Sequence, residues 1–410
     1  MQVAVAVHRL PRALRPLQGA LSTLSTVLPG TVPTATDPTA TVPTAAVPTA
    51  ADHVAPAARA GFAPLRVVAV EELTDDAVAV SLAVPEGLRA VYASRPGQHV
   101  TVRAVLDGTE VRRTYSLCGE PGTDVLTVGI KAVPDGVFSG WVLRGLRAGD
   151  TLDVAPPGGS FGLDVDPDLA RHVAGVVAGS GITPVLGIAR AVLAGEPGSR
   201  VTLLLANRSA RDVMFAEDLA DLRDRYGSRF RLLHVLSREE QTSELLSGRL
   251  DRDRLLRVTA ALLDPADVDD WFLCGPLELV TGARDTLVDD LGVPRDRVHV
   301  ELFHADPVAP RPRAATAAAS TTAHVTLDGR RSTVEVDGGS ETVLDAVLRV
   351  RADAPFACRG GVCGTCRARV VDGEVEMDVN HALEPDELAR GLRLMCQSRP
   401  TTPALEVEFV

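Results

Sequence analysis

The sequence predicts three folded domains: an antiparallel β-barrel, a doubly wound parallel α/β sheet and a small C-terminal α+β domain. Three observations lead to this prediction. Short β-rich runs separated by Gly, Pro and Asp fill residues 65–154, strands and helices alternate from residue 172 onward, and three of the six cysteines lie within nine residues near the C-terminus. A chain of 410 residues is also too long for a single hydrophobic core.

Composition and charge exclude several classes of function. The chain is 45% hydrophobic and contains no uninterrupted apolar run long enough to span a bilayer. Its formal net charge of −12 argues against a nucleic-acid-binding surface and against docking on an acidic membrane. Clustered cysteines are more typical of a cytosolic metal-binding protein than of a secreted disulfide scaffold. We therefore expect a cytoplasmic protein that binds neither nucleic acid nor membrane.

Residues 1–60 differ in composition from the rest of the chain. Residues 31–51 read TVPTATDPTATVPTAAVPTAA, and prolines at this spacing prevent regular helices and sheets. Arg9, Arg12 and Arg15 precede the first acidic residue, which is a weak likeness to a targeting peptide, but no continuous apolar core accompanies them. We expect a disordered and untargeted extension.

A second low-complexity stretch, residues 305–323, reads ADPVAPRPRAATAAASTTA and has the composition of an interdomain linker. It separates a long folded block from a C-terminal domain at residues 324–410. The long block changes its pattern near Pro167. We therefore divide it into domains at residues 61–166 and 167–304.

The first of these domains has the pattern of a small antiparallel barrel. Its short β-rich runs are punctuated by turn residues, and a helical period appears only at residues 138–146. The predicted strands are residues 65–70, 77–84, 99–105, 125–132 and 151–154.

The second domain alternates apolar strands with helices, which predicts βαβ crossovers and a parallel, doubly wound sheet. The predicted strands are residues 172–179, 201–206, 230–236, 271–274 and 298–302. The predicted helices are residues 184–193, 215–226 and 277–290.

Four cysteines in the C-terminal domain follow the plant-type spacing of a [2Fe–2S] site. Cys358, Cys363 and Cys366 form C-x4-C-x2-C, and Cys396 is the distant fourth thiol. Zinc would normally require a second C-x2-C pair or nearby histidines, and disulfides would leave the glycines of the loop unexplained. These glycines permit tight, partly left-handed turns: Gly360, Gly361 and Gly364. We predict that the four cysteines bind a [2Fe–2S] cluster in a β-grasp ferredoxin domain.

A polar motif, Arg113-Thr-Tyr115-Ser116, is expected on a barrel strand, with Gly136-Val-Phe-Ser139 following it. In this order the motifs resemble the FAD-binding barrel of the ferredoxin–NADP reductase superfamily. The resemblance implies that Tyr115 stacks on the isoalloxazine and that Ser116 hydrogen-bonds near its N5. Arg113 and the helix start at Gly136 would bind the pyrophosphate, because guanidinium groups and helix N-termini attract anions. An ordinary strand carrying Arg and Tyr is the alternative.

There are further candidates for cofactor binding. Lys131, the only lysine in the chain, is one of them. A glycine-containing segment between a predicted strand and helix matches the superfamily's G-x-G-x-x-P, whose backbone would meet a dinucleotide pyrophosphate. Its residues are Gly179, Gly181, Thr183 and Pro184.

Cys274-Gly275-Pro276 closes a later strand, as in that superfamily, where the cysteine lies beside the nicotinamide. A plain core cysteine is the alternative reading, and it is the one we prefer for Cys118. Tyr115, Ser116 and Cys274 are thus the candidates for residues that touch the reacting rings.

The nicotinamide nucleotide is predicted to be NADPH, with NADH as the alternative. An NAD site usually has an acid at the end of the second strand, whereas Ala206-Asn207-Arg208 has none here. Arg238 and Arg249 follow later in the domain, and arginines at matching positions bind the 2′-phosphate in NADP-preferring relatives.

The resemblance implies a reductase that passes electrons from NADPH through FAD and the cluster to an acceptor protein. The domain order is that of oxygenase reductase components, and residues 62–410 are most similar to the reductases of phenylacetyl-CoA 1,2-epoxidases. Local matches include Glu301-Leu-Phe303, Leu383-Glu-Pro-Asp-Glu-Leu388 and Cys396-Gln397. This similarity implies a di-iron epoxidase of phenylacetate catabolism as acceptor. The alternatives are the reductase of a steroid hydroxylase, aromatic-ring oxygenase or acyl desaturase, and a redox-sensing or binding protein without turnover.

Overall fold

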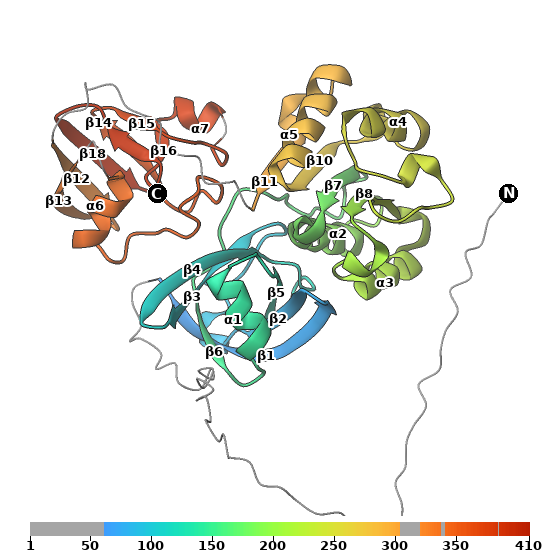
Figure 1. The fold of residues 1–410 in the computed structure, drawn as a ribbon, viewed down its shortest axis with the longest axis horizontal. Coiled ribbons are helices and arrows are strands. Elements are labelled where there is room, and N and C mark those ends of the chain that lie inside the picture. The colour runs from blue at the N-terminus through green and yellow to red at the C-terminus, as the bar shows by residue number, and fades with distance from the viewer. Residues whose placement is uncertain (1–60, 304–319, 338–340, 384) are drawn as a thin grey trace, which may run out of the picture. The chain divides into compact units, whose positions relative to one another are not determined.

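The computed structural model of the protein describes residues 61–303, 320–337, 341–383 and 385–410. The predicted extension at residues 1–60 lies outside the described residues, and so does most of the predicted linker. The described chain contains an antiparallel sheet of six strands, a parallel sheet of five strands, and a mixed sheet of five strands with a separate two-stranded sheet (Figure 1). In this described part, no helix is both long and apolar enough to cross a bilayer.

The six antiparallel strands form the first domain, in the order β4–β3–β6–β1–β2–β5. A bridge between Leu117 and Val128 joins the end of β4 to β5 and closes the barrel. Apolar side chains such as Leu65, Val80 and Val102 fill its interior and exclude water. The elements are β1 (Ala63–Thr74), β2 (Ala77–Ala83), β3 (His99–Leu106), β4 (Thr109–Ser116), β5 (Val125–Lys131), α1 (Val137–Gly145) and β6 (Thr151–Val154).

The sequence patterns located five of these strands and the helix, but not β4 as a separate run. β4 reads TEVRRTYS, and its three charged residues hide the alternation that marks a half-buried strand. It nevertheless carries the Arg-Thr-Tyr-Ser motif, which was expected on a barrel strand. The strand pairs along its whole length with β3, from His99 opposite Ser116 to Leu106 opposite Thr109.

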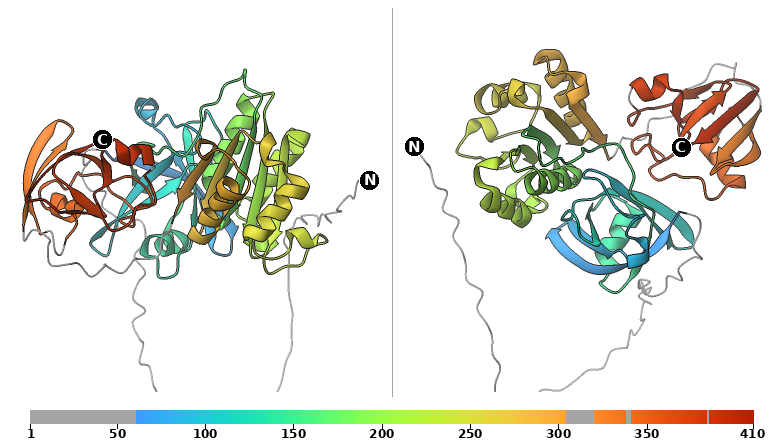
Figure 2. Two further views of the ribbon diagram at one scale, coloured as in Figure 1. Left: turned by 90° about the horizontal axis from the view of Figure 1, so that it is seen from above. Right: turned by 180° about the vertical axis from the view of Figure 1, so that it is seen from behind.

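The five parallel strands form the second domain, in the order β11–β10–β7–β8–β9. Figure 2 shows helices on both faces of this sheet. Neighbouring residues of β7 face opposite sides: Val173 joins the apolar cluster of α2 and α3, and Ala174 the cluster of α4 and α5. The elements are β7 (His172–Ala178), α2 (Ile182–Gly195), β8 (Arg200–Asn207), α3 (Ala216–Tyr226), β9 (Phe230–Leu236), α4 (Arg252–Leu262), β10 (Asp270–Gly275), α5 (Leu277–Asp285) and β11 (Val298–Leu302).

The predicted doubly wound sheet is therefore confirmed, with one helix added. α4 reads RDRLLRVTAAL, and only Leu255, Val258 and Thr259 are buried, so its apolar stripe is too narrow to stand out in the sequence. The helix predicted over residues 277–290 is continued after α5 by a π-helical turn, Thr286–Asp290.

The third domain has a mixed sheet in the order β13–β12–β18–β14–β16, with α6 packed against it. Thr342 and Asp345 form a capping box that starts α6. β12 begins at Thr321, so the last three residues of the predicted linker are in fact part of a strand paired with β13. The elements are β12 (Thr321–Leu327), β13 (Arg330–Val336), α6 (Val343–Val350), β14 (Arg367–Asp372), β15 (Val375–Met377), α7 (Pro385–Ala389), β16 (Leu392–Leu394), β17 (Ser398–Pro400) and β18 (Ala404–Phe409).

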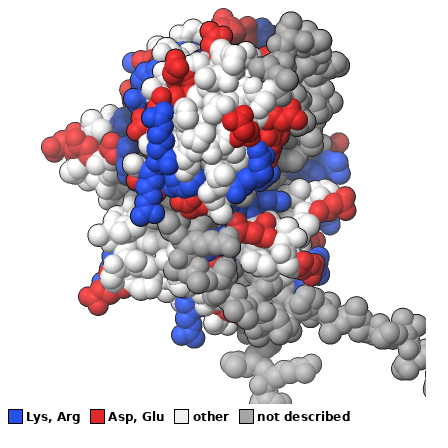
Figure 3. Space-filling model, turned by 90° about the vertical axis from the view of Figure 1, so that its left-hand side faces the viewer, with Lys and Arg blue, Asp and Glu red and all other residues white. Residues whose placement is uncertain are grey.

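Surface charge is interspersed on the face drawn in Figure 3. Basic and acidic side chains alternate there, and no single large patch of either sign dominates the view. The net charge of −12 therefore does not give this face a uniform acidic field.

A buried carboxylate ties the start of the second domain to the turn after α2. Glu196 is 0% exposed and accepts hydrogen bonds from Arg171 Nη2 at 2.6 Å, Ser199 Oγ at 2.7 Å and the Asp166 backbone N–H at 3.2 Å. Burial alone would raise the pKa of Glu196. The hydrogen bonds from Arg171, Ser199 and Asp166 outweigh burial and hold this pKa below its usual value.

We predict that Glu196→Gln lowers the thermal unfolding midpoint at pH 7, with a loss of about 2 to 3 kcal/mol, because a buried charged hydrogen-bond network loses its anion. A carboxylate with a depressed folded-state pKa stabilises the fold above its unfolded pKa of 4.5, and this stabilisation disappears as the pH falls through the folded value. The gap between the variant and the parent should therefore narrow below about pH 4.5 in differential scanning calorimetry. The exposed Glu240→Gln is the control, and equal midpoints for all three proteins at pH 7 would contradict the prediction.

Candidate functional site

The flavin motif lies on β4, whose residues alternate between two sides. Arg113 is exposed, Tyr115 is partly buried, and Ser116 is 3% exposed. The Tyr115 ring centroid lies 5.8 Å from that of Phe138 on α1, with the planes tilted by 34°. Burial raises the pKa of Tyr115 well above its usual value, so its hydroxyl stays protonated. The strand thus offers an aromatic face and a guanidinium on one side.

The turn before α1 forms a cradle of backbone groups. Ser139 Oγ accepts the Val133 N–H at 3.1 Å and donates to the Gly136 carbonyl at 3.4 Å. A Cβ on Gly136 would lie 2.6 Å from Ser139 Oγ and 2.8 Å from the Val133 carbonyl oxygen, so only glycine fits there. The first-turn N–H groups of α1 have no intrahelical acceptors, as at any helix start, and suit an anion.

Lys131 ends β5 at the edge of this cradle and is already paired. Its Nζ lies 2.5 Å from Asp76 Oδ1 in the turn between β1 and β2. The other Asp76 oxygen lies 3.8 Å from Arg208 Nη2 of the second domain. Asp76 therefore connects Lys131 of the first domain with the arginine expected at the nucleotide.

The glycine motif occupies the turn between β7 and α2. Gly179 has φ +55°, which favours glycine, and the side chain of Thr183 closes the turn by donating to the Ser180 carbonyl at 3.0 Å. A Cβ on Gly181 would lie 2.2 Å from the Cys274 carbonyl oxygen. The turn and the end of β10 therefore touch, and the predicted Gly-x-Gly and Cys-Gly-Pro motifs come together.

The candidate residues at the end of β10 differ in their surroundings. Cys274 is 0% exposed, Gly275 has φ +151°, and Pro276 is the N-cap of α5. Burial first, and then the nearby Glu301 carboxylate, raise the pKa of Cys274. The thiol is therefore neutral and is not an activated nucleophile.

Glu301 joins the two halves of the site. Its backbone is paired with Cys274 in the parallel register of β10 and β11. Ser116 Oγ donates to Glu301 Oε2 at 3.0 Å, and His99 Nδ1 lies 3.8 Å from Oε1. The serine expected beside the flavin and the cysteine expected beside the nicotinamide thus meet through one carboxylate.

Sequence reasoning assigned no role to Glu301 or His99. The available signal is the acidic residue near the end of a predicted strand, in Glu301-Leu-Phe303, which is also one of the local matches to the related reductases. His99 follows a Pro-Gly-Gln turn, and nothing in the sequence relates it to Glu301, which is about two hundred residues away.

The three candidate arginines have unequal surroundings. Arg208 pairs with Asp212 at 2.6 Å, and Arg249 pairs with Glu278. Arg238 is exposed, and its guanidinium has no ion-pair partner within the described ranges. Its backbone N–H donates to the Arg208 carbonyl at 2.7 Å, so the two arginines are adjacent at the ends of β8 and β9.

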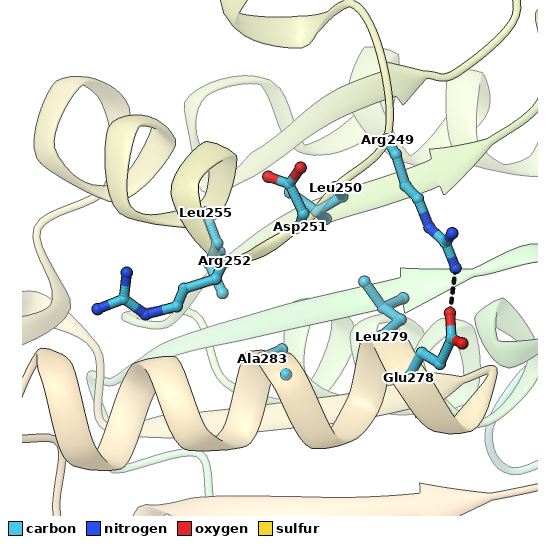
Figure 4. Close-up of a pocket in the computed structure, with 9 residues that line it drawn as sticks. Arg249, Leu250, Asp251, Arg252, Leu255, Glu278, Leu279 and Ala283 are labelled. Carbon is cyan, nitrogen blue, oxygen red and sulfur yellow. Dashed lines mark hydrogen bonds and ion pairs between the residues drawn. The ribbon is translucent and has the colours of Figure 1, made fainter.

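A pocket of about 350 Å³ lies between the segment leading into α4 and the first turns of α5. Figure 4 shows the Arg249–Glu278 ion pair at one end and Arg252 at the other. Leu250 and Leu279 supply apolar lining. Both arginines of the pocket are paired with carboxylates, Arg249 with Glu278 and Arg252 with Asp290.

The four cysteines of the third domain fall into two interacting pairs. The neighbouring Cys363 thiol lowers the pKa of Cys358, and the neighbouring Cys366 thiol lowers the pKa of Cys396. Among the described residues, no three or more His, Cys, Asp or Glu side chains are grouped closely enough to hold one metal ion. Two pairs of thiols are instead what the two irons of a [2Fe–2S] cluster require.

Backbone N–H groups also point at these sulfurs. The Gly360 N–H lies 3.3 Å from Cys358 Sγ, and the Cys396 N–H lies 3.4 Å from Cys366 Sγ. Gly361 and Gly364 have φ +75° and +65°, as expected for left-handed turns, but Gly360 does not. The left-handed residue at that point is Arg359, with φ +54°, and its carbonyl accepts from Gln397 Nε2 at 2.7 Å.

A barrel with a flavin motif, a parallel sheet with a dinucleotide turn and a four-cysteine β-grasp domain define a flavin and iron–sulfur electron-transfer oxidoreductase. Family comparisons agree domain by domain. An oxidoreductase FAD-binding domain matches residues 64–162, an oxidoreductase NAD-binding domain residues 176–285, and a 2Fe-2S iron-sulfur cluster binding domain residues 325–401.

The chain belongs to the family of reductase components of oxygenase systems. It is 39% identical to one of the subunits of 1,2-phenylacetyl-CoA epoxidase of Escherichia coli (strain K12), over 85% of this chain and 98% of the relative. It is 36% identical to the ferredoxin reductase component of 3-ketosteroid-9-alpha-monooxygenase of Rhodococcus rhodochrous, over 84% of this chain and 96% of that relative.

Solved structures show the same architecture. Phthalate dioxygenase reductase is 25% identical with a TM-score of 0.55, over 85% of this chain and 98% of that chain. An intact type IV self-sufficient cytochrome P450 monooxygenase gives a TM-score of 0.62 at 27% identity, over 84% of this chain and 41% of that one. The predicted fold class, the enzyme class and the presence of FAD-, NAD- and 2Fe-2S-type domains are confirmed.

Proposed function

We propose that the protein transfers electrons from NADPH through FAD and a [2Fe–2S] cluster to a di-iron epoxidase that acts on phenylacetyl-CoA. The observation that carries this proposal is the match to one polypeptide of the Escherichia coli 1,2-phenylacetyl-CoA epoxidase, over 98% of that relative. When bound, FAD accepts a hydride and delivers electrons singly to the cluster. The residues of this chain supply binding, geometry and exclusion of water.

The flavin half of the proposal rests on β4 and the turn before α1. Tyr115 would lie against the isoalloxazine, and Arg113 with the N–H groups after Gly136 would bind the pyrophosphate. Ser139 holds that turn through its two backbone hydrogen bonds. Lys131 keeps a place beside the flavin, with its charge balanced by Asp76.

The nicotinamide half rests on the contact between the β7–α2 turn and the end of β10. Gly179, Gly181 and the start of α2 would bind the pyrophosphate, and Thr183 and Pro184 shape that turn. Cys274 would lie beside the nicotinamide, followed by Gly275 and Pro276. Glu301 holds the Ser116 hydroxyl in place between the two rings.

Cys358, Cys363, Cys366 and Cys396 are the proposed iron ligands, in the two pairs described above. Replacing Cys363 with serine should reduce bound iron and acid-labile sulfide by more than about tenfold, because an alkoxide is a poor substitute for a thiolate at iron. Reduction of ferricyanide by NADPH, which needs only the flavin, should continue at an unchanged rate.

The matched control for this experiment is Cys118→Ser, a buried cysteine of the barrel end that lies outside the four. Its iron and sulfide content should equal that of the parent. Full cluster content in the Cys363 variant, measured by iron analysis and electron paramagnetic resonance, would contradict the ligand assignment.

NADPH preference is supported most directly by Arg238. Its guanidinium is unpaired within the described part of the chain, whereas Arg208 and Arg249 are partly neutralised by Asp212 and Glu278. A 2′-phosphate would therefore meet a free cation at Arg238 without displacing a carboxylate. NADH is the alternative nucleotide, since two of the three arginines are compensated.

The double variant Arg208→Ala, Arg238→Ala should raise the KM for NADPH at least about tenfold, because removing phosphate contacts costs roughly 1.5 to 3 kcal/mol for a charge-assisted hydrogen bond. The KM for NADH should change less than about twofold, measured by ferricyanide reduction. Arg211→Ala, an exposed neighbour of the same segment, is the control. Equal effects on both nucleotides would overturn the assignment.

The proposed acceptor rests on similarity to relatives and not on residues of the site, because this reductase would not touch the final substrate. A second candidate is a different oxygenase, such as the steroid hydroxylase suggested by the 36% identity to a 3-ketosteroid-9-alpha-monooxygenase reductase component, or an aromatic-ring oxygenase or acyl desaturase. Steady NADPH oxidation with ferricyanide would separate either reading from a redox sensor without turnover.

Reconstitution with purified oxygenase components decides between these acceptors. We expect NADPH- and O₂-dependent epoxidation of phenylacetyl-CoA when the protein is mixed with a di-iron phenylacetyl-CoA epoxidase, at a rate at least about tenfold above that with a steroid 9α-hydroxylase on its own substrate. The product is measured by liquid chromatography and mass spectrometry. A faster reaction with the steroid enzyme would replace the epoxidase as the proposed acceptor.

A further inference from the structure

β4 has a second charged side chain that none of the proposed cofactor contacts uses. Arg112 precedes Arg113 and points to the opposite side of the strand, as alternation requires. It is 4% exposed, and Glu110 of the same strand lies 2.8 Å from its Nη2. Arginine is rarely buried without partners, so another part of the chain must cover Arg112, whereas the neighbouring Arg113 is exposed.

That surface belongs to the third domain. Arg112 Nη1 donates to the Ala354 carbonyl at 3.3 Å, and Nη2 donates to the Ala352 carbonyl at 3.4 Å. The guanidinium carbon lies 4.2 Å from the centroid of the Phe356 ring. Arg112 thus contacts one short segment, residues 352–356, through two backbone acceptors and one aromatic face.

The barrel side of this contact is held in place. Arg103, the cross-strand partner of Arg112, is 2% exposed and bonds Asp153 Oδ2 at 2.9 Å. Phe62 lies under both guanidinium groups, 4.4 Å from that of Arg103 and 5.2 Å from that of Arg112. The aromatic ring, the two arginines and their carboxylates form a preorganised receiving site.

The segment that Arg112 holds leads directly into the cluster loop. Phe356 is two residues before Cys358, and its ring also lies 4.7 Å from the guanidinium of Arg359. Further along the loop, Val362 is 7% exposed and belongs to the apolar cluster of the second domain, against which Cys358 also packs. One loop of the third domain therefore contacts both other domains.

We propose that Arg112 is a positioning residue that docks the cluster-binding loop onto the strand that carries the flavin motif. In the docked arrangement Arg112 contacts the loop from the same strand that carries Arg113, Tyr115 and Ser116, so a single strand relates the two redox centres. This rests on the proposed electron route and goes beyond it, because it names the contact that sets the distance between flavin and cluster.

Arginine suits this role for a geometric reason. Its planar guanidinium can donate to two carbonyls in its own plane while its face lies on an aromatic ring. A lysine has one small cationic head and cannot make these contacts together. Arg112→Lys should therefore restore only part of what Arg112→Leu loses.

The first test measures docking without relying on activity. Hydrogen–deuterium exchange of the full-length holoprotein should become about tenfold faster in peptides covering residues 351–357 of Arg112→Leu, because the loss of a buried stacked and hydrogen-bonded cation weakens the closed state. Arg66→Leu is the control, since Arg66 is an exposed arginine of β1 in the same barrel. Its exchange should match the parent.

The second test separates flavin from cluster. After rapid mixing with NADPH, flavin bleaching in Arg112→Leu should keep the parent rate, while growth of the cluster's electron paramagnetic resonance signal should slow about tenfold. Normal ferricyanide reduction would show that the NADPH-to-flavin step of the proposed function survives in the variant.

Phe356→Leu keeps the proposal testable if Arg112→Leu fails to fold. It should also show faster exchange and slower cluster reduction, because it removes the ring on which the Arg112 guanidinium lies. The combined effect of the double variant should be smaller than the sum of the two single effects, because the substitutions share this cation–π contact. Unchanged exchange at residues 351–357 and an unchanged rate of cluster reduction in the folded variants would overturn the proposal. Additive effects of the two substitutions would do so as well.

Discussion

The hydrogen bond from Ser116 to Glu301 is the contact on which the arrangement of the flavin and nucleotide sites depends. It joins a barrel strand to the last strand of the parallel sheet at 3.0 Å. Such a contact requires the domains to approach closely, and two glycines make room. A Cβ on Gly129 would lie 2.6 Å from the Thr183 methyl carbon, and one on Gly187 would lie 2.6 Å from the Leu117 carbonyl oxygen. Side chains at these two positions would push the domains apart and take Ser116 out of reach of Glu301.

The chemistry of the site follows from how charge is distributed around this junction. At its centre lie a neutral hydroxyl, a thiol whose pKa is raised by burial and one carboxylate, so the site needs no acid or base of unusual strength. The cations lie further out, at the positions where phosphates are expected. Hydride transfer between two rings requires that the rings are aligned and that water is excluded. It depends less on side chains that transfer protons. In the cluster domain, too, neutral groups face the site: backbone N–H groups are directed at cysteine sulfurs.

Sequence reasoning succeeded where a feature depends on neighbours in the chain. Cysteine spacing, the glycine motif and the β–α rhythm are local patterns. The glycine motif lies at a strand-to-helix turn, as expected, and the strands and helices alternate as expected. Sequence reasoning failed where partners are distant. β4 reads as polar because its two sides are covered by elements far away, and Arg112 meets Ala354 across 242 positions. Glu301 looks like an ordinary strand carboxylate until the barrel is placed against it. The arginines were identified as residue types, but only the fold shows which of them is compensated.

The eight residues of β4 make several of these contacts with distant parts of the chain. Because side chains alternate, Arg113 and Tyr115 lie on one side of the strand, while Arg112 and Ser116 lie on the other and reach the third and second domains respectively. A one-residue slip in the pairing of β4 with β3 would exchange these roles and abolish all of them together. The unbroken register from Leu106–Thr109 to His99–Ser116 is therefore a functional constraint as much as a structural one. It also means that a loss of activity from substitution on this strand identifies a site only when flavin reduction, nucleotide binding and cluster reduction are measured separately.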